Sequence, residues 1–295
     1  MPDHPAPPRP QPVEDLRELS VAGAGGVTLS GEESGDGPAV VLLHGLTATR
    51  RYVVMGSRAL QRSGHRVISY DARGHGRSMP ADGPRGYGYE LLAADLLAVL
   101  DQAGVQRALL AGVSMGSHTA VRFVLHHPER VAALAIITPA FDPTLLRADV
   151  DISSWDALAR GLREGGADGF VAAYDLQRLP ESLRSTVETV LRQRIAAHEH
   201  PDAVADALEG VPRSRPFEQI EQLATIAVPT VVVASRDQAD PLHPIVVAER
   251  YSQTIPGAQL RVEDDGQAPL AWQGGRISQV IADLGARAGH AQLPA

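Results

Sequence analysis

The chain has 295 residues, 44% of them hydrophobic and 21% charged, with no cysteine and a formal net charge of -8. This composition is typical of a soluble globular protein, and the acidic balance argues against nucleic acid as a partner, because phosphate binding requires a basic surface. The lack of cysteine excludes disulfides, thiolate metal sites and cysteine nucleophiles. The length suits one large domain, or a core with an insertion.

The N-terminal segment begins MPDHPAPPRPQP, with six prolines in twelve residues and no apolar run. Proline at this density prevents helix and inner strand, so the sequence predicts a disordered arm over residues 1–15. A secretory signal needs a basic start and an apolar stretch, and both are missing. No window approaches the roughly 20 apolar residues that cross a bilayer. We therefore expect a cytoplasmic protein without a membrane partner.

Short apolar runs alternate with helical stretches along most of the chain. Such runs are typical of strands buried on both faces, and their alternation with helices predicts a mostly parallel, doubly wound α/β sheet. The first two strands are expected to form an antiparallel pair. Strands are expected at 19–22, 27–30, 39–43, 67–70, 108–113, 133–137, 230–233 and 259–262, and helices at 51–63, 88–103, 115–126 and 244–254.

One interval breaks this alternation: residues 141–217 contain helical, charged stretches and no strand run. A long insertion in a compact domain is more often functional than decorative, so we expect a helical cap over the site. The predicted organisation is an α/β core formed by 16–140 and 218–288, the cap 141–217 between them, and a flexible tail 289–295.

A Gly-x-Ser-x-Gly sequence, Gly112 to Gly116, stands between the strand 108–113 and the helix 115–126. In this context the motif predicts a nucleophile elbow, a tight turn that exposes the hydroxyl of Ser114 above the sheet. The flanking glycines are needed because larger side chains would collide in the turn. The N–H of Met115 lies at the positive end of the helix, where it can stabilise an oxyanion.

Two further segments resemble the α/β-hydrolase fold superfamily in order and spacing. The strand 39–43 ends in His44-Gly45-Leu46-Thr47, similar to the family's His-Gly loop, and the strand 67–70 ends in DARGHGRS at 71–78, similar to its structural D-x-R-G-x-G-x-S turn. The resemblance covers roughly residues 16–288. It implies a serine esterase or acyl hydrolase, with the N–H of Leu46 as the second oxyanion donor and His44 shaping the loop.

The acid of a triad is expected after the strand 230–233, since the family order is Ser, Asp, His. The loop reads SRDQADPLHP over 235–244, and the family often carries its acid in a D-P-x-x-P setting. The resemblance therefore favours Asp240 over Asp237. Asp142 is a third candidate, because some members carry their acid after the preceding strand.

The histidine is where this sequence departs from the family. Members place Gly-His in the loop after the last strand, but here Gly266 is followed by Gln267. A glutamine amide cannot take up a proton, whereas serine attack needs a base. Another histidine could serve: His243 lies in the acid loop, His118 one helical turn beyond Ser114, and His290 near the C-terminus.

The glutamine is also compatible with two different origins. Gln267 could be an introduced His-to-Gln substitution in an ordinary hydrolase, or the protein could be a ligand-binding, lyase-type or cyclase-type member that does not hydrolyse. The hypothesis is hydrolysis of a carboxylic ester or related acyl bond in a small molecule through a Ser114 acyl-enzyme. No cofactor is implied, and His198-Glu199-His200 lacks metal-site spacing. The oligomeric state is left open. Three cap aromatics hint at an apolar acyl pocket: Trp155, Phe170 and Tyr174.

Overall fold

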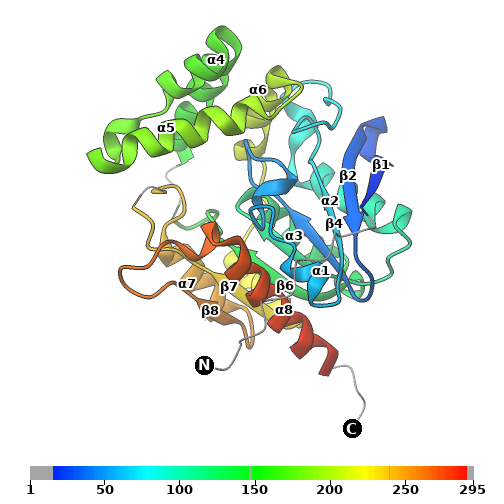
Figure 1. Cartoon of the computed structure of the whole chain (residues 1–295). Helices are drawn as coiled ribbons and strands as arrows, with labels where there is room; N and C mark the ends of the chain where they lie inside the picture. Colours follow the sequence, from blue (N-terminus) through cyan, green and yellow to red (C-terminus); the bar gives the residue numbers. More distant parts are fainter. Residues whose placement is uncertain (1–15, 146–147, 239, 291–295) are drawn as a thin grey trace, which may run out of the picture.

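A single eight-stranded sheet forms the centre of the molecule (Figure 1). The structure, a computed structural model, describes residues 16–145, 148–238 and 240–290. The strands follow the order β1-β2-β4-β3-β5-β6-β7-β8. Their bounds are β1 Arg17–Ala22, β2 Thr28–Ser34, β3 Ala39–Leu43, β4 Arg66–Tyr70, β5 Ala108–Val113, β6 Val131–Ile137, β7 Thr230–Val233 and β8 Gln259–Arg261.

The six strands from β3 to β8 pair in parallel, whereas β1 pairs with β2 and β2 with β4 in antiparallel fashion. Successive residues of a strand face opposite sides of the sheet, and both sides are apolar here. In β3, for example, Val40 packs into the core on one face and Val41 into the core on the other. This confirms the predicted doubly wound α/β class and its antiparallel first pair.

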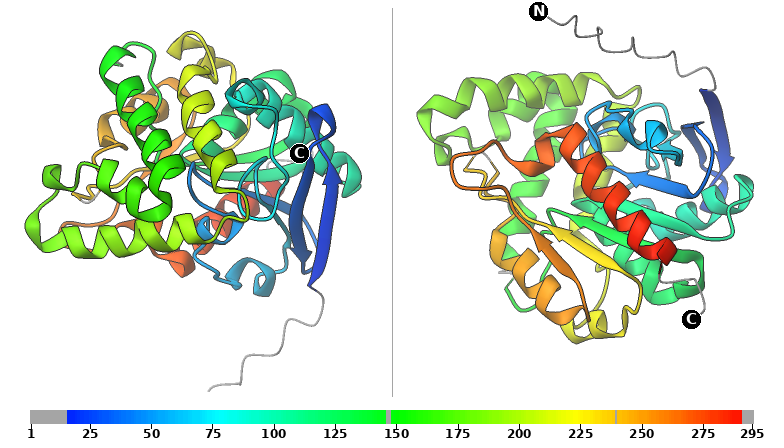
Figure 2. Two further views of the ribbon diagram at one scale, coloured as in Figure 1. Left: turned by 90° about the horizontal axis from the view of Figure 1, so that it is seen from above. Right: turned by 60° about the horizontal axis from the view of Figure 1, so that its bottom comes forward.

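Helices cover both faces of the sheet. On one face lie α2 (Tyr89–Gln102), α3 (Met115–His126) and α7 (Ile245–Thr254), and on the other α1 (Ala59–Arg62) and α8 (Gly274–His290). Figure 2 shows α8 lying across its face of the sheet. Because parallel strands all end at the same edge, the loops after β3, β5 and β7 lie close together, and they carry the candidate site.

The helix expected over 51–63 is shorter than predicted. The structure has a 3-10 turn at Arg50–Tyr52 and the four-residue helix α1, separated by a break. Met55 and Gly56 adopt positive φ angles of 48° and 72°. A residue in this left-handed region cannot continue a right-handed helix, so the apolar periodicity of this segment does not produce one helix.

The chain between β6 and β7 is helical, with α4 (Ala148–Ala173), α5 (Glu181–Ala196) and α6 (Pro201–Gly210) lying beside one another on the same side of the sheet (Figure 1). These helices have a hydrophobic core of their own, and Leu46 of the β3 loop packs against it. Within α4, Gly166 has a φ of 57° and interrupts the helical conformation. The helical interval therefore contacts the loop expected to form the oxyanion hole.

The predicted N-terminal arm, residues 1–15, lies outside the described residues. The predicted tail 289–295 begins inside α8, which continues to His290, and residues 291–295 lie outside the described part. Among the described residues, no helix combines the length and the apolar character that crossing a membrane requires.

Candidate active site

The turn between β5 and α3 holds Ser114 in a strained conformation, with φ 49° and ψ -115°. Its glycines are required by close backbone contacts. A Cβ at Gly112 would lie 2.3 Å from the carbonyl of Gly116, and a Cβ at Gly116 would lie 2.2 Å from the carbonyl oxygen of Leu43. Only glycine fits at both positions, and a strained serine between strand and helix is the geometry of a nucleophile elbow.

A histidine contacts this serine directly. Nε2 of His243 lies 2.7 Å from Oγ of Ser114, and Nδ1 of His243 lies 2.7 Å from the carboxylate oxygens of Asp240. The three side chains form a continuous hydrogen-bonded chain in the order acid, imidazole, hydroxyl. Side-chain exposure is 24% at Asp240 and 17% at His243, so solvent reaches the cluster.

Local turn chemistry brings the acid and the imidazole together. The N–H of His243 donates to the carbonyl oxygen of Asp240 at 3.4 Å, which closes a four-residue turn. Pro241 occupies the second position, where its fixed φ favours such a turn, and Pro244 directly precedes α7. The first and fourth residues of the turn therefore present their side chains to one another.

The ionisation state of the acid fixes the tautomer of the imidazole. Burial favours the neutral carboxyl, but the charge and hydrogen bond of His243, together with Arg194, hold the pKa of Asp240 below its ordinary value. An ionised carboxylate only accepts hydrogen bonds, so Nδ1 of His243 must carry the hydrogen. In the neutral imidazole Nε2 then has a lone pair directed at the hydroxyl of Ser114, which is the arrangement a general base needs.

The other two acid candidates are engaged elsewhere. The carboxylate of Asp237 accepts a hydrogen bond from Nε1 of Trp272 at 2.8 Å. Asp142 is fully buried, accepts from the N–H and hydroxyl of Thr144, and lies 3.0 Å from Arg250. Both hydrogen bonds of the His243 Nδ1 run to Asp240.

The two expected oxyanion donors lie on either side of Ser114. The loop residue Gly45 abuts it, since a Cβ at Gly45 would lie 3.4 Å from the Cβ of Ser114. The amides of Leu46 and Met115 donate no hydrogen bond within the described part of the chain. His44 fixes the loop: its Nδ1 donates to the carbonyl of Gly45, and its Nε2 accepts from the N–H of Ala72, each at 2.8 Å.

Gln267, predicted in the histidine slot, is not brought to the serine. Its side chain is exposed, donating to Asp264 at 3.2 Å and accepting from Arg276 at 2.7 Å. The physical reason lies in the loop after β8, where the N–H of Gln267 closes a turn on the carbonyl of Asp264 and Gly266 adopts a φ of 79°. That turn directs the amide to surface partners.

The remaining histidine candidates are not near enough to replace His243. His118 is buried, and its Nε2 accepts from the N–H groups of Ala140 and Phe141 at 3.1 and 3.2 Å. Burial, with a smaller effect of His243, lowers its pKa to about 3, so it stays neutral with its lone pair occupied. The side chain of His290 lies outside what the structure describes.

Two positioning residues were not predicted from the sequence. The buried carboxylate of Glu263 accepts from the N–H groups of Arg236 and Leu270, at 2.5 and 3.2 Å, and so joins the acid loop to the loop after β8. His198, at the end of the helical interval, accepts from the N–H of Gly76 at 2.8 Å and donates to the carbonyl of Thr47 at 3.0 Å. It thereby ties the insertion to the oxyanion loop.

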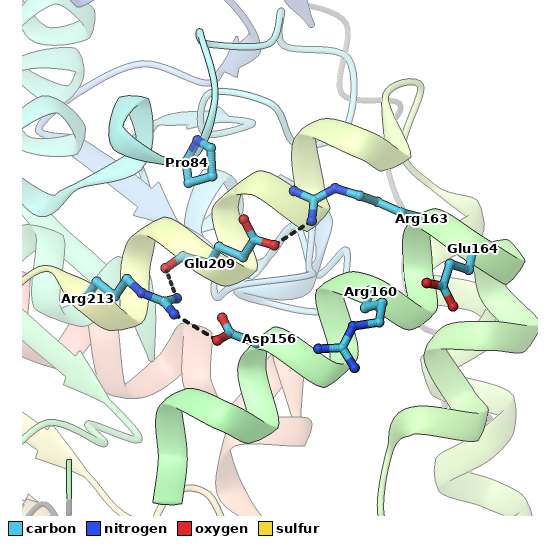
Figure 3. Close-up of a pocket in the computed structure, with 7 residues that line it drawn as sticks. All are labelled: Pro84, Asp156, Arg160, Arg163, Glu164, Glu209 and Arg213. Carbon is cyan, nitrogen blue, oxygen red and sulfur yellow. Dashed lines mark hydrogen bonds and ion pairs between the residues drawn. The ribbon is translucent and has the colours of Figure 1, made fainter. Parts of the chain in front are cut away.

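A separate polar pocket of about 720 Å³ lies between α4 and α6, beside Pro84 (Figure 3). Its charged groups largely satisfy one another: Arg213 pairs with Asp156 at 2.8 Å, and Arg163 with Glu209 at 2.5 Å. None of its lining residues belongs to the Ser114 cluster, so it is not the site of the candidate chemistry.

The aromatic residues expected to line an acyl pocket belong instead to the core of the helical interval. Phe170 is buried there, and Trp155 and Tyr174 pack against the same cluster. Burial, followed by the negative charge of Asp240, raises the pKa of Tyr174, which places this phenol in the electrostatic field of the site.

The mostly parallel sheet, the elbow at Ser114 and the adjoining imidazole define the class of α/β hydrolases. A family model described as alpha/beta hydrolase fold matches residues 38–274, and the chain belongs to that family. It is a hydrolase of this class.

Named relatives agree with this assignment. The chain is 28% identical over 262 residues to a putative carbamate hydrolase RutD of Variovorax paradoxus, covering 88% of this chain and 96% of that protein. It is 32% identical over 235 residues to a 2-hydroxy-6-oxononadienedioate/2-hydroxy-6-oxononatrienedioate hydrolase 2 of Pseudomonas putida, covering 76% and 78%. A thermophilic esterase from Thermogutta terrifontis superposes with a TM-score of 0.75 at 27% identity, over 92% and 99% of the two chains.

Proposed function

We propose that the chain hydrolyses carboxylic esters or related acyl bonds of small molecules through an acyl-enzyme on Ser114. The observation that carries the proposal is the 2.7 Å contact between Nε2 of His243 and Oγ of Ser114. A non-hydrolytic role would follow from a missing base, and this contact supplies a base. The relatives named as an esterase and as hydrolases support the same reaction type.

In the first half-reaction, Oγ of Ser114 attacks the acyl carbon while Nε2 of His243 takes its proton. The charge that develops on the carbonyl oxygen is stabilised by the N–H groups of Leu46 and Met115. The imidazolium, stabilised by Asp240, then returns the proton to the leaving oxygen, and the C–O bond breaks to give alcohol and acyl-enzyme.

In the second half-reaction, water attacks the acyl carbon and gives its proton to His243. The tetrahedral intermediate collapses, the imidazolium returns a proton to Oγ of Ser114, and the carboxylic acid leaves. The helical interval 141–217 acts as a cap in this proposal, because it contacts the oxyanion loop through Leu46 and His198.

The experiment combines a fluorophosphonate probe with a chromogenic ester, 4-nitrophenyl butyrate. The unaltered chain should release 4-nitrophenol and become labelled at Ser114, whereas Ser114→Ala should do neither while keeping its thermal unfolding temperature. Hydrolysis that persists in purified Ser114→Ala, above a mock preparation, would exclude this serine as the nucleophile. A folded wild-type chain that neither labels nor hydrolyses would overturn the proposal.

A further inference from the structure

The guanidinium of Arg194, in the last turn of α5, lies between two aromatic rings. Its central carbon is 5.4 Å from the ring centroid of Tyr52 and 5.0 Å from that of Trp272. Tyr52 belongs to the loop after β3 and Trp272 to the segment after β8, so residues from both halves of the core clamp a cation from the helical interval. This stacking fixes the plane of the guanidinium and leaves its edge N–H groups available.

Those N–H groups have no partner in the described ranges of the chain. Nε of Arg194 is buried without a hydrogen bond, and no ion pair within 4 Å joins the guanidinium to a described carboxylate. The neighbouring Arg192, by contrast, pairs with both Asp168 and Glu188. An unpartnered buried donor is costly, and native proteins keep such groups mainly where a ligand or water completes them.

The cluster around Arg194 lies beside the proposed triad. Burial lowers the pKa of Arg194, and the negative charge of Asp240 is the largest effect that opposes it. The phenol of Tyr174 lies within the field of both groups. The hydroxyls of Tyr52 and Tyr174, like the guanidinium, make no hydrogen bond with the described residues. Three sets of unused donors therefore converge next to His243 and Asp240.

We propose that Arg194, with the hydroxyls of Tyr52 and Tyr174, binds a carboxylate carried by the substrate at the end remote from the scissile bond. This inference rests on the proposed function and names its substrate class: esters whose acyl chain ends in a carboxylate. A guanidinium presents parallel N–H groups that match the two oxygens of a carboxylate, and the aromatic clamp orients them in advance. A net-negative protein gains selectivity for an anionic substrate from this local cation.

The test compares two esters of equal chain length, mono-4-nitrophenyl glutarate and 4-nitrophenyl pentanoate. We expect the unaltered chain to prefer the glutarate ester in kcat/KM. Arg194→Gln should lower the ratio of the two kcat/KM values about ten- to hundredfold, mainly through KM of the glutarate ester, because a charge-assisted hydrogen bond is lost. Arg192→Gln, two residues earlier on the same helix, is the matched control and should keep the wild-type ratio.

Glutarate itself provides a readout that does not depend on turnover. It should bind the Ser114→Ala chain in calorimetry, and adding Arg194→Lys, which keeps the charge but not the fork, should weaken that binding. An unchanged kcat/KM ratio in Arg194→Gln, or no glutarate binding to the Ser114→Ala chain, would overturn the inference. If glutarate binds through Arg194 but neither ester is cleaved, the anion site stands and the proposed hydrolysis fails.

Discussion

Nε2 of His243 lies 2.7 Å from Oγ of Ser114, although the two residues are 129 positions apart in the chain. The imidazole reaches the serine from the turn that also carries Asp240, three residues earlier, and not from the loop after β8. Acid and base therefore share one short segment between β7 and α7. The geometry of this segment, fixed by two prolines, decides whether the serine is activated.

The acid is expected to control the tautomer of His243. In Asp240→Asn, the amide N–H of residue 240 can face Nδ1, which favours the imidazole with its hydrogen on Nε2. That tautomer cannot accept the proton of Ser114, so kcat of ester hydrolysis should fall by about 10²–10⁴-fold with KM nearly unchanged. Asp237→Asn is the control, since Asp237 accepts a hydrogen bond from Trp272 and its variant should retain most activity. Equal losses in the two variants would remove Asp240 from its proposed role.

Gln267 offers a second, contrasting prediction. Its side chain is exposed and bonded to Asp264 and Arg276, so Gln267→Ala should change kcat/KM by less than about threefold. For the same reason, Gln267→His should not increase hydrolysis, because the loop directs residue 267 away from the serine. A rise of tens-fold in Gln267→His, measured with 4-nitrophenyl butyrate, would show that this position does face the nucleophile.

The buried histidines predict how stability depends on pH. Burial lowers the pKa of His198 to about 4 from its ordinary 6.5, so the folded state binds fewer protons than the unfolded state between these values. Its contribution is complete above about pH 6.5, shrinks as the pH falls, and is lost once the pH passes below about 4. The full contribution corresponds to roughly 3 kcal/mol.

His198→Gln should therefore unfold at a lower temperature than the wild type at pH 7.5, with a smaller difference at pH 5. Gln removes the titrating group but keeps an amide at the contact with Gly76 and Thr47. Thermal unfolding by circular dichroism at the two pH values checks this. A constant difference between the two proteins would show that His198 does not titrate on unfolding.

The elements of the fold and the serine are predictable from the sequence because their signals are local. Apolar runs identify buried strands, and the elbow depends on contacts between residues four apart, Gly112 and Gly116. The Asp240 turn is equally local: Pro241 and Pro244 favour a turn whose first and fourth residues are an acid and a histidine. The family spacing points to position 267 instead, and it obscures this local signal.

Other features of the site depend on contacts between distant segments. Arg194 meets Tyr52 and Trp272, and His198 meets Gly76, only after the helical interval folds onto the core. The sequence around Arg194 is an ordinary charged helix, and nothing in it separates an unpartnered arginine from a solvated one. The broken helix at Met55 and Gly56 likewise follows from backbone angles that periodicity does not report.

The role of His243 as the base for Ser114 is tested most directly by measuring kcat/KM of His243→Gln with 4-nitrophenyl butyrate. Glutamine keeps a hydrogen-bonding side chain of similar reach but cannot take up a proton. We expect a loss of at least about 10²–10⁴-fold, with fluorophosphonate labelling of Ser114 slowed in parallel and the unfolding temperature within a few degrees of the wild type. A folded His243→Gln chain that hydrolyses the ester within about threefold of the wild-type rate would contradict this role.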